Sequence, residues 1–151
     1  MATVVNGWQY NIIGSATNGF PITIVSGTDR SLSGIGSDYA DIIGNSARPA
    51  NVASIAQFFN TSAFAQAAPG TFGDTGRGIL RGPNYFDLDM SLFKDFRFTE
   101  RWRLQFRTEA FNVENRANFQ LPVAQVSSGT FGRITAAYDP RVFQFAAKLF
   151  F

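Results

Sequence analysis

Two neighbouring segments alternate apolar and polar residues, and this alternation constrains the fold more than any other feature of the chain. In residues 86–98 the even positions are apolar apart from Lys94, and the odd positions are mostly polar. Residues 102–112 continue the pattern, with Trp102, Leu104 and Phe106 on the even side. A period of two residues is the pattern of a β-strand with two different faces. The sequence therefore predicts two long strands.

The two segments are separated only by Thr99, Glu100 and Arg101, which predicts a tight hairpin. Centring the turn on Glu100 places apolar residues opposite apolar ones, whereas a slip of one residue would mix the two faces. The predicted register is therefore well determined. It pairs Phe98 with Trp102, Phe96 with Leu104, Lys94 with Phe106, Leu92 with Thr108, and Met90 with Ala110.

Two further segments alternate in the same way, so we predict an all-β antiparallel meander of about four long strands. The strands are expected near residues 7–17, 86–98, 102–112 and 141–151, and long loops near 18–85 and 113–130. Within the first loop we expect a strand extension at residues 22–25, one or two helical turns at 51–59, and irregular chain at 70–83.

Residues 131–138 are open to two interpretations. They could form a fifth membrane strand, but that would place the connection at 115–129 on the same side as the hairpin turn. We therefore expect them to extend the last strand outward.

The composition favours strands in a membrane. Charged residues make up 16% of the chain, against about 25% in ordinary soluble domains. Seventeen residues are Phe, yet the mean hydropathy is only −0.03, so the apolar residues are dispersed among polar ones. No apolar run approaches the length of about 20 residues that a transmembrane helix requires. Residues 1–7 do not resemble a signal peptide, so we expect Met1 to be an internal or artificial start.

The aromatic residues fit one arrangement in a bilayer. Only helices and closed barrels span lipid, and barrel strands place aromatic girdles at the two interfaces. If Phe151 lies at the periplasmic side, the antiparallel order puts the tight turn there too and both long loops outside, as is usual in such barrels. The predicted aromatic girdle is Trp8, Tyr10, Phe96, Phe98 and Trp102.

Four strands cannot close, because about eight are the minimum for a barrel. We therefore expect the chain to be the C-terminal fragment of a larger barrel or to assemble with other copies. The alternative is a soluble antiparallel sheet with one wet face.

The odd positions of the hairpin carry the best polar cluster, which we expect to face the barrel lumen. Asp95 should lie opposite Gln105 and diagonal to Arg103 and Arg107. A salt-bridge ladder is the favoured interpretation, and a substrate path or a contact with a plug is the alternative. The predicted cluster is Asp87, Asp89, Asp95, Arg103, Arg107 and Glu109.

The residue types leave little room for catalysis. The chain has no Cys and no His, which excludes thiol catalysis, disulfides, histidine metal sites and the Ser-His-Asp triad. Asp29, Asp38 and Asp41 lie in one loop, but their spacing matches no calcium loop. Asp87 and Asp89 share a strand face, where pairing with arginines is the more usual role. We expect no catalytic residue, no metal, no cofactor and no enzymatic activity. The net charge of +2 gives no electrostatic argument for nucleic acid binding.

Several motifs carry a family resemblance that covers nearly the whole chain. They are RGPNYFDLDMSLFKDF at 81–96, RLQFRTEAFNVENRANF at 103–119, FNTSAF at 59–64, FGRI at 131–134 and DPR at 139–141. In combination they resemble the C-terminal end of TonB-dependent outer-membrane receptors, most of all the Oar-like group that contains a carboxypeptidase regulatory domain. The last strand resembles the C-terminal signal that the barrel-assembly machinery reads, through Phe143, Phe145, Leu149 and Phe151.

The resemblance implies a barrel of about 22 strands plugged by an N-terminal domain. The implied function is uptake of a nutrient across the bacterial outer membrane, powered by TonB through an N-terminal part that this chain lacks. The implied partners are outer-membrane lipid, the remaining strands and plug, the barrel-assembly machinery and TonB. Two other classes stay open: a self-assembling structural β protein that forms a fibre or tube, and a soluble binding module.

Overall fold

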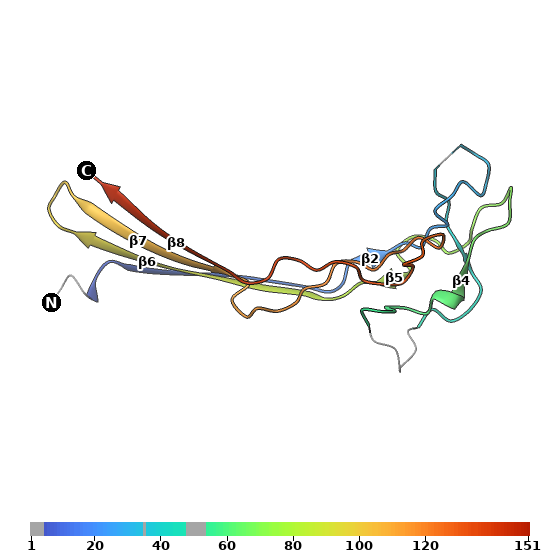
Figure 1. The fold of residues 1–151 in the computed structure, drawn as a ribbon, viewed down its shortest axis with the longest axis horizontal. Helices are drawn as coiled ribbons and strands as arrows, with labels where there is room; N and C mark the ends of the chain where they lie inside the picture. The colour runs from blue at the N-terminus through green and yellow to red at the C-terminus, as the bar shows by residue number, and fades with distance from the viewer. Residues whose placement is uncertain (1–4, 35, 48–53) are drawn as a thin grey trace. The chain divides into compact units, whose positions relative to one another are not determined.

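The computed structural model describes residues 5–34, 36–47 and 54–151. The chain divides into two compact units, which are described separately (Figure 1). The sheet unit comprises Met1–Thr17, Tyr85–Asn118 and Asp139–Phe151. The loop unit comprises Asn18–Asn84 and Phe119–Tyr138.

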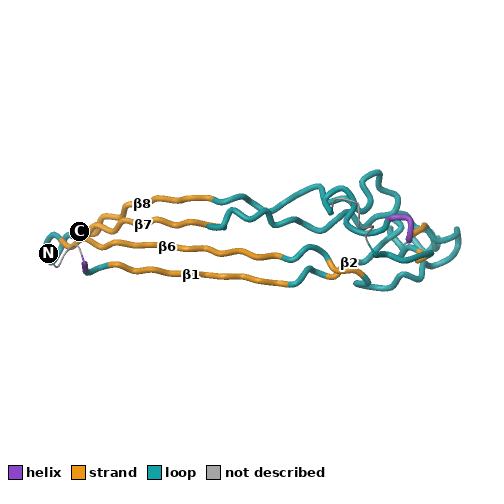
Figure 2. Tube along the Cα trace, turned by 90° about the horizontal axis from the view of Figure 1, so that it is seen from below, coloured by secondary structure: helices purple, strands orange, loops and turns teal. Residues whose placement is uncertain are grey.

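The sheet unit is built on four antiparallel strands in the order β1-β6-β7-β8, which is a meander (Figure 2). Each strand begins and ends within one residue of the range predicted from the alternation. The strands are β1 (Trp8–Thr17), β6 (Tyr85–Arg97), β7 (Arg103–Phe111) and β8 (Val142–Phe150).

The predicted hairpin register is confirmed. Phe96 lies opposite Leu104 and Lys94 opposite Phe106, while beyond the strands the Phe98 N–H donates to the Trp102 carbonyl at 3.0 Å. The other two pairings also place apolar residues on a common face. Trp8 lies opposite Lys94 in the β1–β6 pair, and even residues of β7 lie opposite odd residues of β8. Because Leu104 faces Leu149 and Ala110 faces Phe143, one largely apolar face runs across all four strands.

This apolar face lies open to the surroundings. Trp8, Ile12 and Phe143 are each exposed by more than half, and Phe145 is 74% exposed. A patch of this size is unusual for a protein in water and is typical of a surface that contacts another apolar phase. In the described ranges, no helix has the length and apolar character needed to cross a bilayer.

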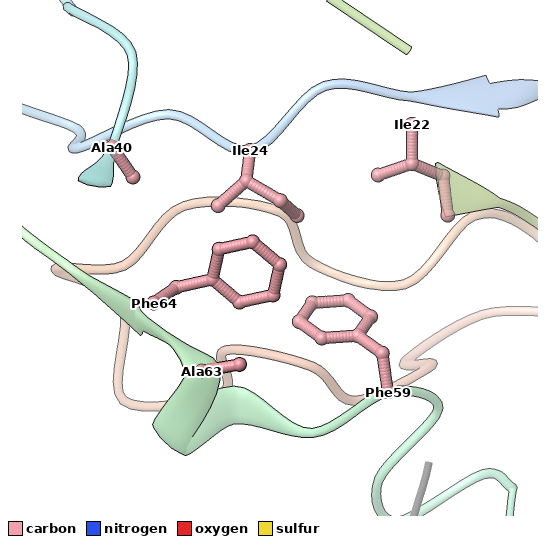
Figure 3. Packing of buried hydrophobic residues seen from close by; sticks show 6 residues of the cluster. All are labelled: Ile22, Ile24, Ala40, Phe59, Ala63 and Phe64. Atoms are coloured by element: carbon pink, nitrogen blue, oxygen red, sulfur yellow. The ribbon is translucent and has the colours of Figure 1, made fainter. Parts of the chain in front are cut away.

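The loop unit has a conventional buried core instead (Figure 3). The rings of Phe59 and Phe64 pack edge to face with centroids 5.7 Å apart, and Phe131 packs edge to face on Phe59 at 5.2 Å. Such aromatic pairs stabilise a core beyond the area they bury. The buried cluster consists of Ile22, Ile24, Ala40, Phe59, Ala63 and Phe64.

Short regular elements surround this core, where the sequence predicted mainly irregular chain. β2 (Pro21–Ile22) pairs with β5 (Leu80–Arg81), and β3 (Asp41–Ile42) pairs with β4 (Phe64–Ala65). The predicted strand extension at residues 22–25 is therefore shorter than expected, and β5 lies inside the segment 70–83.

The predicted helical turns at residues 51–59 are wrong for the part that is described. Residues 51–53 lie outside the described residues, and residues 54–59 form turns and bends without a helix. A short 3-10 helix, η1 (Thr61–Ala63), follows instead. Asn60 caps it, because its side-chain oxygen accepts the Ser62 N–H at 3.3 Å.

Residues 131–138 neither extend β8 nor form a further long strand, so the expectation for them is wrong. They lie against the chain around residue 120, where the Gln120 N–H donates to the Ala136 carbonyl at 3.1 Å. Gly132 has a φ of 78°, which turns the chain away from an extended path. Pro140, which has no N–H to donate, then separates this segment from β8.

Candidate functional site

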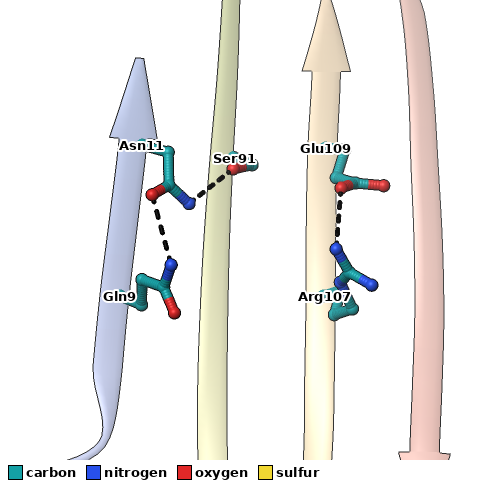
Figure 4. Close-up of polar contacts among 5 residues, drawn as sticks. All are labelled: Gln9, Asn11, Ser91, Arg107 and Glu109. Carbon is teal, nitrogen blue, oxygen red and sulfur yellow. Dashed lines mark hydrogen bonds and ion pairs between the residues drawn. The ribbon is translucent and has the colours of Figure 1, made fainter.

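The polar face of the sheet holds all six members of the predicted cluster at odd positions of β6 and β7. The side-chain contacts drawn in Figure 4 join residues two positions apart on one strand or residues opposite each other on paired strands. Arg107 and Glu109, neighbours on the same face of β7, approach to 3.4 Å. On the other side of β6, the Asn11 amide donates to the Ser91 hydroxyl at 3.0 Å and Gln9 donates to Asn11 at 3.2 Å.

The expected ladder through Asp95 is not formed. Asp95 does lie opposite Gln105, but the Arg107–Glu109 contact is the one ion pair among the described residues. One oxygen of Asp95 is buried without a hydrogen-bond partner.

The two arginines of β7 lie over aromatic rings of neighbouring strands. The Arg103 guanidinium is 4.2 Å from the ring of Phe150, and that of Arg107 is 4.3 Å from the ring of Phe93. Phe93 and Phe150 are exceptions on the polar face, which is therefore a mixture of cations and aromatic rings. Because guanidinium groups stack well on aromatic faces, these contacts take the place of the expected ion pairs.

Asp87 and Asp89 share the polar face but have different neighbours. The Asp89 carboxylate accepts the Asn112 N–H at 3.0 Å, just beyond the end of β7. It therefore holds the chain where it leaves the sheet. Asp87 lies opposite Ser15 of β1.

A basic cavity beside the hairpin turn was not predicted from the sequence. Arg97 and Arg103 lie directly opposite each other, an arrangement that destabilises a sheet when nothing compensates the charge. Together with Arg101, Glu100 and Phe98 they line a cavity of about 600 Å³. The signal was present, since the predicted register already pairs the two arginines.

The predicted aromatic girdle gathers at one end of the sheet. Phe96 lies near the end of β6 and Phe98 just beyond it, and Trp102 follows the turn and stacks on Phe151 with ring centroids 5.6 Å apart. Trp8 begins β1 at the same end, because it lies opposite Lys94. Tyr10 lies two residues further along and its hydroxyl donates to the Met90 sulfur at 3.3 Å.

The proposed assembly signal occupies the apolar face of β8. Phe143, Phe145 and Leu149 lie opposite Ala110, Thr108 and Leu104 of β7, all on the even face of that strand. Phe151, beyond the strand, is 89% exposed apart from its contact with Trp102. The structure thus brings these side chains onto one surface.

The loop carboxylates considered for calcium hold the backbone of their own loop. Asp38 accepts the N–H groups of Arg30 at 2.6 Å and Ser31 at 2.7 Å, and these bonds hold the pKa of Asp38 below its usual value. The Ser31 N–H is the largest cause, and burial opposes the shift. Asp29 accepts the N–H of Gly34 at 2.8 Å. Asp41 begins β3 and lies opposite Ala65 of β4.

These features define a class of protein: an all-β wall with one apolar face open to its surroundings and one charged face. A family model described as an outer membrane beta barrel domain matches residues 1–144. The chain therefore belongs to this family of outer-membrane β-barrel domains, and it is located in the bacterial outer membrane. Comparisons with curated proteins and with solved structures found no match.

Proposed function

We propose that the chain forms part of the wall of a TonB-dependent transporter that takes up a nutrient, such as a chelate or an oligosaccharide. The observation that carries the proposal is the two-faced sheet in a chain of the outer-membrane barrel family. The motifs shared with TonB-dependent receptors support the finer assignment. The role is one of lining and sealing a pathway, without catalysis.

Each face then has a role. The apolar face, which carries the even residues of β1, β6 and β7 and the odd residues of β8, contacts lipid. The polar face lines the lumen, where the arginines and carboxylates of β6 and β7 contact substrate or plug. The hairpin turn lies on the periplasmic side. The two long connections leave the opposite end of the sheet, because Thr17 lies opposite Tyr85 and Phe111 opposite Val142. These two connections are extracellular and contribute to substrate recognition.

The partners follow from this arrangement. The remaining strands pair with the open edges of β1 and β8, the plug fills the lumen, and TonB engages an N-terminal part outside this chain. The barrel-assembly machinery reads the last strand. Deleting Phe151 from the complete protein should therefore lower its insertion into the membrane, and unchanged insertion would count against this role.

Transport is tested by uptake into cells that carry or lack the gene. A panel of labelled metal chelates and oligosaccharides should reveal at least one compound whose uptake requires the gene. That uptake should stop when the proton-motive force is dissipated or TonB is removed. Uptake that needs the gene but survives loss of TonB would refute the coupled mechanism.

The orientation is tested separately by cysteine labelling, for which the chain is well suited because it contains no Cys. A water-soluble maleimide that does not cross the outer membrane should label Ser33→Cys on intact cells. It should label Glu100→Cys, in the hairpin, only after the membrane is permeabilised. The reverse pattern would invert the proposed topology.

A second candidate function rests on the open edges of the sheet. Among the described residues, β1 and β8 each pair with one neighbouring strand only, and unpaired strands template the addition of further chains. The second proposal is that copies of the chain assemble into a tube or fibre. Filaments that lengthen with the concentration of purified chain would support it, and a membrane-inserted species of fixed size would exclude it.

A further inference from the structure

Among the described residues, Lys94 is the one cation on the otherwise apolar face of the sheet, and it lies at the end where the aromatic residues gather. The side chain is 5% exposed, and its Nζ donates to the Asn6 carbonyl at 2.6 Å. The Nζ also lies 4.7 Å from the centre of the Trp8 ring and 5.3 Å from that of Phe96. The ammonium group is thus held in place by a carbonyl and two rings.

The local backbone is shaped to hold it there. Gly7 has a φ of 83°, and its carbonyl accepts the Asp95 N–H at 2.8 Å, so the chain turns just before β1. A Cβ atom at Gly7 would lie only 2.7 Å from the Asp95 carbonyl oxygen. This turn positions the Asn6 carbonyl at Lys94.

A groove extends from Lys94 along the same face. It has a volume of about 330 Å³, and its walls are the side chains of Trp8, Leu92, Lys94, Phe96, Phe106 and Thr108. The register orders these walls. Trp8, Lys94 and Phe106 lie side by side, Phe96 lies nearer the hairpin, and Leu92 with Thr108 lies further into the sheet. The groove therefore has a cationic, aromatic end and an apolar end.

We propose that this groove binds one phospholipid with an anionic headgroup, with its phosphate at Lys94 and an acyl chain along Leu92, Phe106 and Thr108. The inference rests on the proposed orientation, in which the apolar face contacts lipid. A cation is costly at the centre of a bilayer but tolerated near the interface. There it can attract anionic headgroups, while an aromatic ring beside it occupies the same depth. The order of charge and apolar surface in the groove matches that of a phospholipid.

The test uses the fluorescence of Trp8 in the complete protein reconstituted in vesicles. Trp102 does not line the groove and is replaced by Phe, as is every tryptophan of the complete protein outside this chain. Phosphatidylcholine vesicles receive increasing fractions of brominated phosphatidylglycerol or of brominated phosphatidylcholine, and quenching gives the relative affinity of the two lipids at Trp8. We expect phosphatidylglycerol to be favoured about fivefold, the effect of one basic side chain near an anionic membrane surface.

Three variants separate the site from general charge effects. Lys94→Gln should reduce the preference to about onefold, and Lys94→Arg should retain it. Lys148→Gln is the matched control, because Lys148 lies on the opposite face of the sheet, 4.8 Å from the ring of Phe150. It should leave the preference unchanged.

The outcomes distinguish the inference from the orientation on which it rests. Absence of quenching by either lipid would overturn both, because Trp8 would not face lipid. Equal quenching by both lipids in the chain with Lys94 would overturn the lipid site and leave the orientation standing. An equal loss of preference in Lys148→Gln would also overturn the site, since net charge alone would then explain it. The comparison of the two lipids with Lys94 present decides the matter even if Lys94→Gln fails to insert.

Discussion

The two units bury their apolar residues in opposite ways. In the sheet unit Phe145 is 74% exposed, whereas in the loop unit Phe59 is 2% exposed and packs on Phe64 and Phe131. One chain thus carries an exposed apolar surface suited to lipid and a unit whose buried core suits it to an aqueous environment. The loop unit holds its own apolar residues, while the sheet unit depends on a surrounding apolar phase to cover them.

The largest effect that would sharpen this contrast is expected in the loop-unit core. Phe59→Ala should destabilise the loop unit by about 3–5 kcal/mol, because it leaves a cavity among buried rings. Hydrogen exchange in vesicles should then show faster exchange around the core and unchanged exchange in β6 and β7. The matched control is Phe72→Ala, since Phe72 is 70% exposed and should matter little. Equal effects of the two changes would mean that the core does not hold the loop unit together.

On the sheet the same residue type should respond to charge. Phe145→Arg places a cation on the apolar face near the middle of β8 and should destabilise the inserted protein by about 2–4 kcal/mol. Gln144→Arg adds the same charge one residue away on the polar face and should have little effect. Denaturant unfolding from lipid vesicles measures both. A larger effect at Gln144 than at Phe145 would reverse the assignment of the faces.

A pH-dependent effect is expected in the loop that contains Asp38. Its folded pKa is lowered, chiefly by the Ser31 N–H. The stabilisation is therefore complete above the unfolded pKa of about 3.9 and is lost as the pH falls through the folded value.

Limited proteolysis of this loop should consequently speed up under acid conditions. Asp38→Asn should bring fast cleavage at neutral pH and remove most of the pH dependence. Asp41→Asn in the same unit is the control, because Asp41 makes no hydrogen bond through its side chain in the described part of the chain. An acid response that survives Asp38→Asn would assign it to another group.

The smallest effect belongs to the ion pair on the polar face. Arg107 and Glu109 are 3.4 Å apart, with side chains 39% and 23% exposed. A double-mutant cycle of Arg107→Gln and Glu109→Gln should give a coupling of about 0.2–1 kcal/mol, as for other solvated pairs. A coupling of several kcal/mol would mean that the lumen side of the sheet is far drier than a water-filled barrel.

The sheet could be predicted from the sequence because its information is local. Alternation fixes which side chains share a face, and the short turn at Glu100 fixes the register of β6 and β7. The sequence could not show that Arg107 would lie over Phe93 and leave Asp95 unpaired, since that choice depends on side-chain geometry. Lys94 was visible as an exception to the apolar face, but its contact with Asn6 depends on the turn at Gly7.

The loop unit was harder to predict because its order comes from distant contacts. Ile24, Phe59 and Phe131 form one cluster from three separate parts of the chain, and no periodic pattern marks them. Residues 131–138 looked like a strand because they are apolar in places. Their partners lie around residue 120, and Gly132 with Pro140 separates them from β8.

The alternation of environment along β8 tests the central claim most directly. Single cysteines introduced at residues 143–149 and spin-labelled in vesicles report their accessibility to oxygen, which concentrates in lipid, and to a water-soluble nickel chelate. We predict that Phe143, Phe145, Ala147 and Leu149 favour oxygen, and that Gln144, Ala146 and Lys148 favour the chelate, with a period of two residues. Equal accessibility to the chelate on both faces would contradict the assignment of the apolar face to lipid.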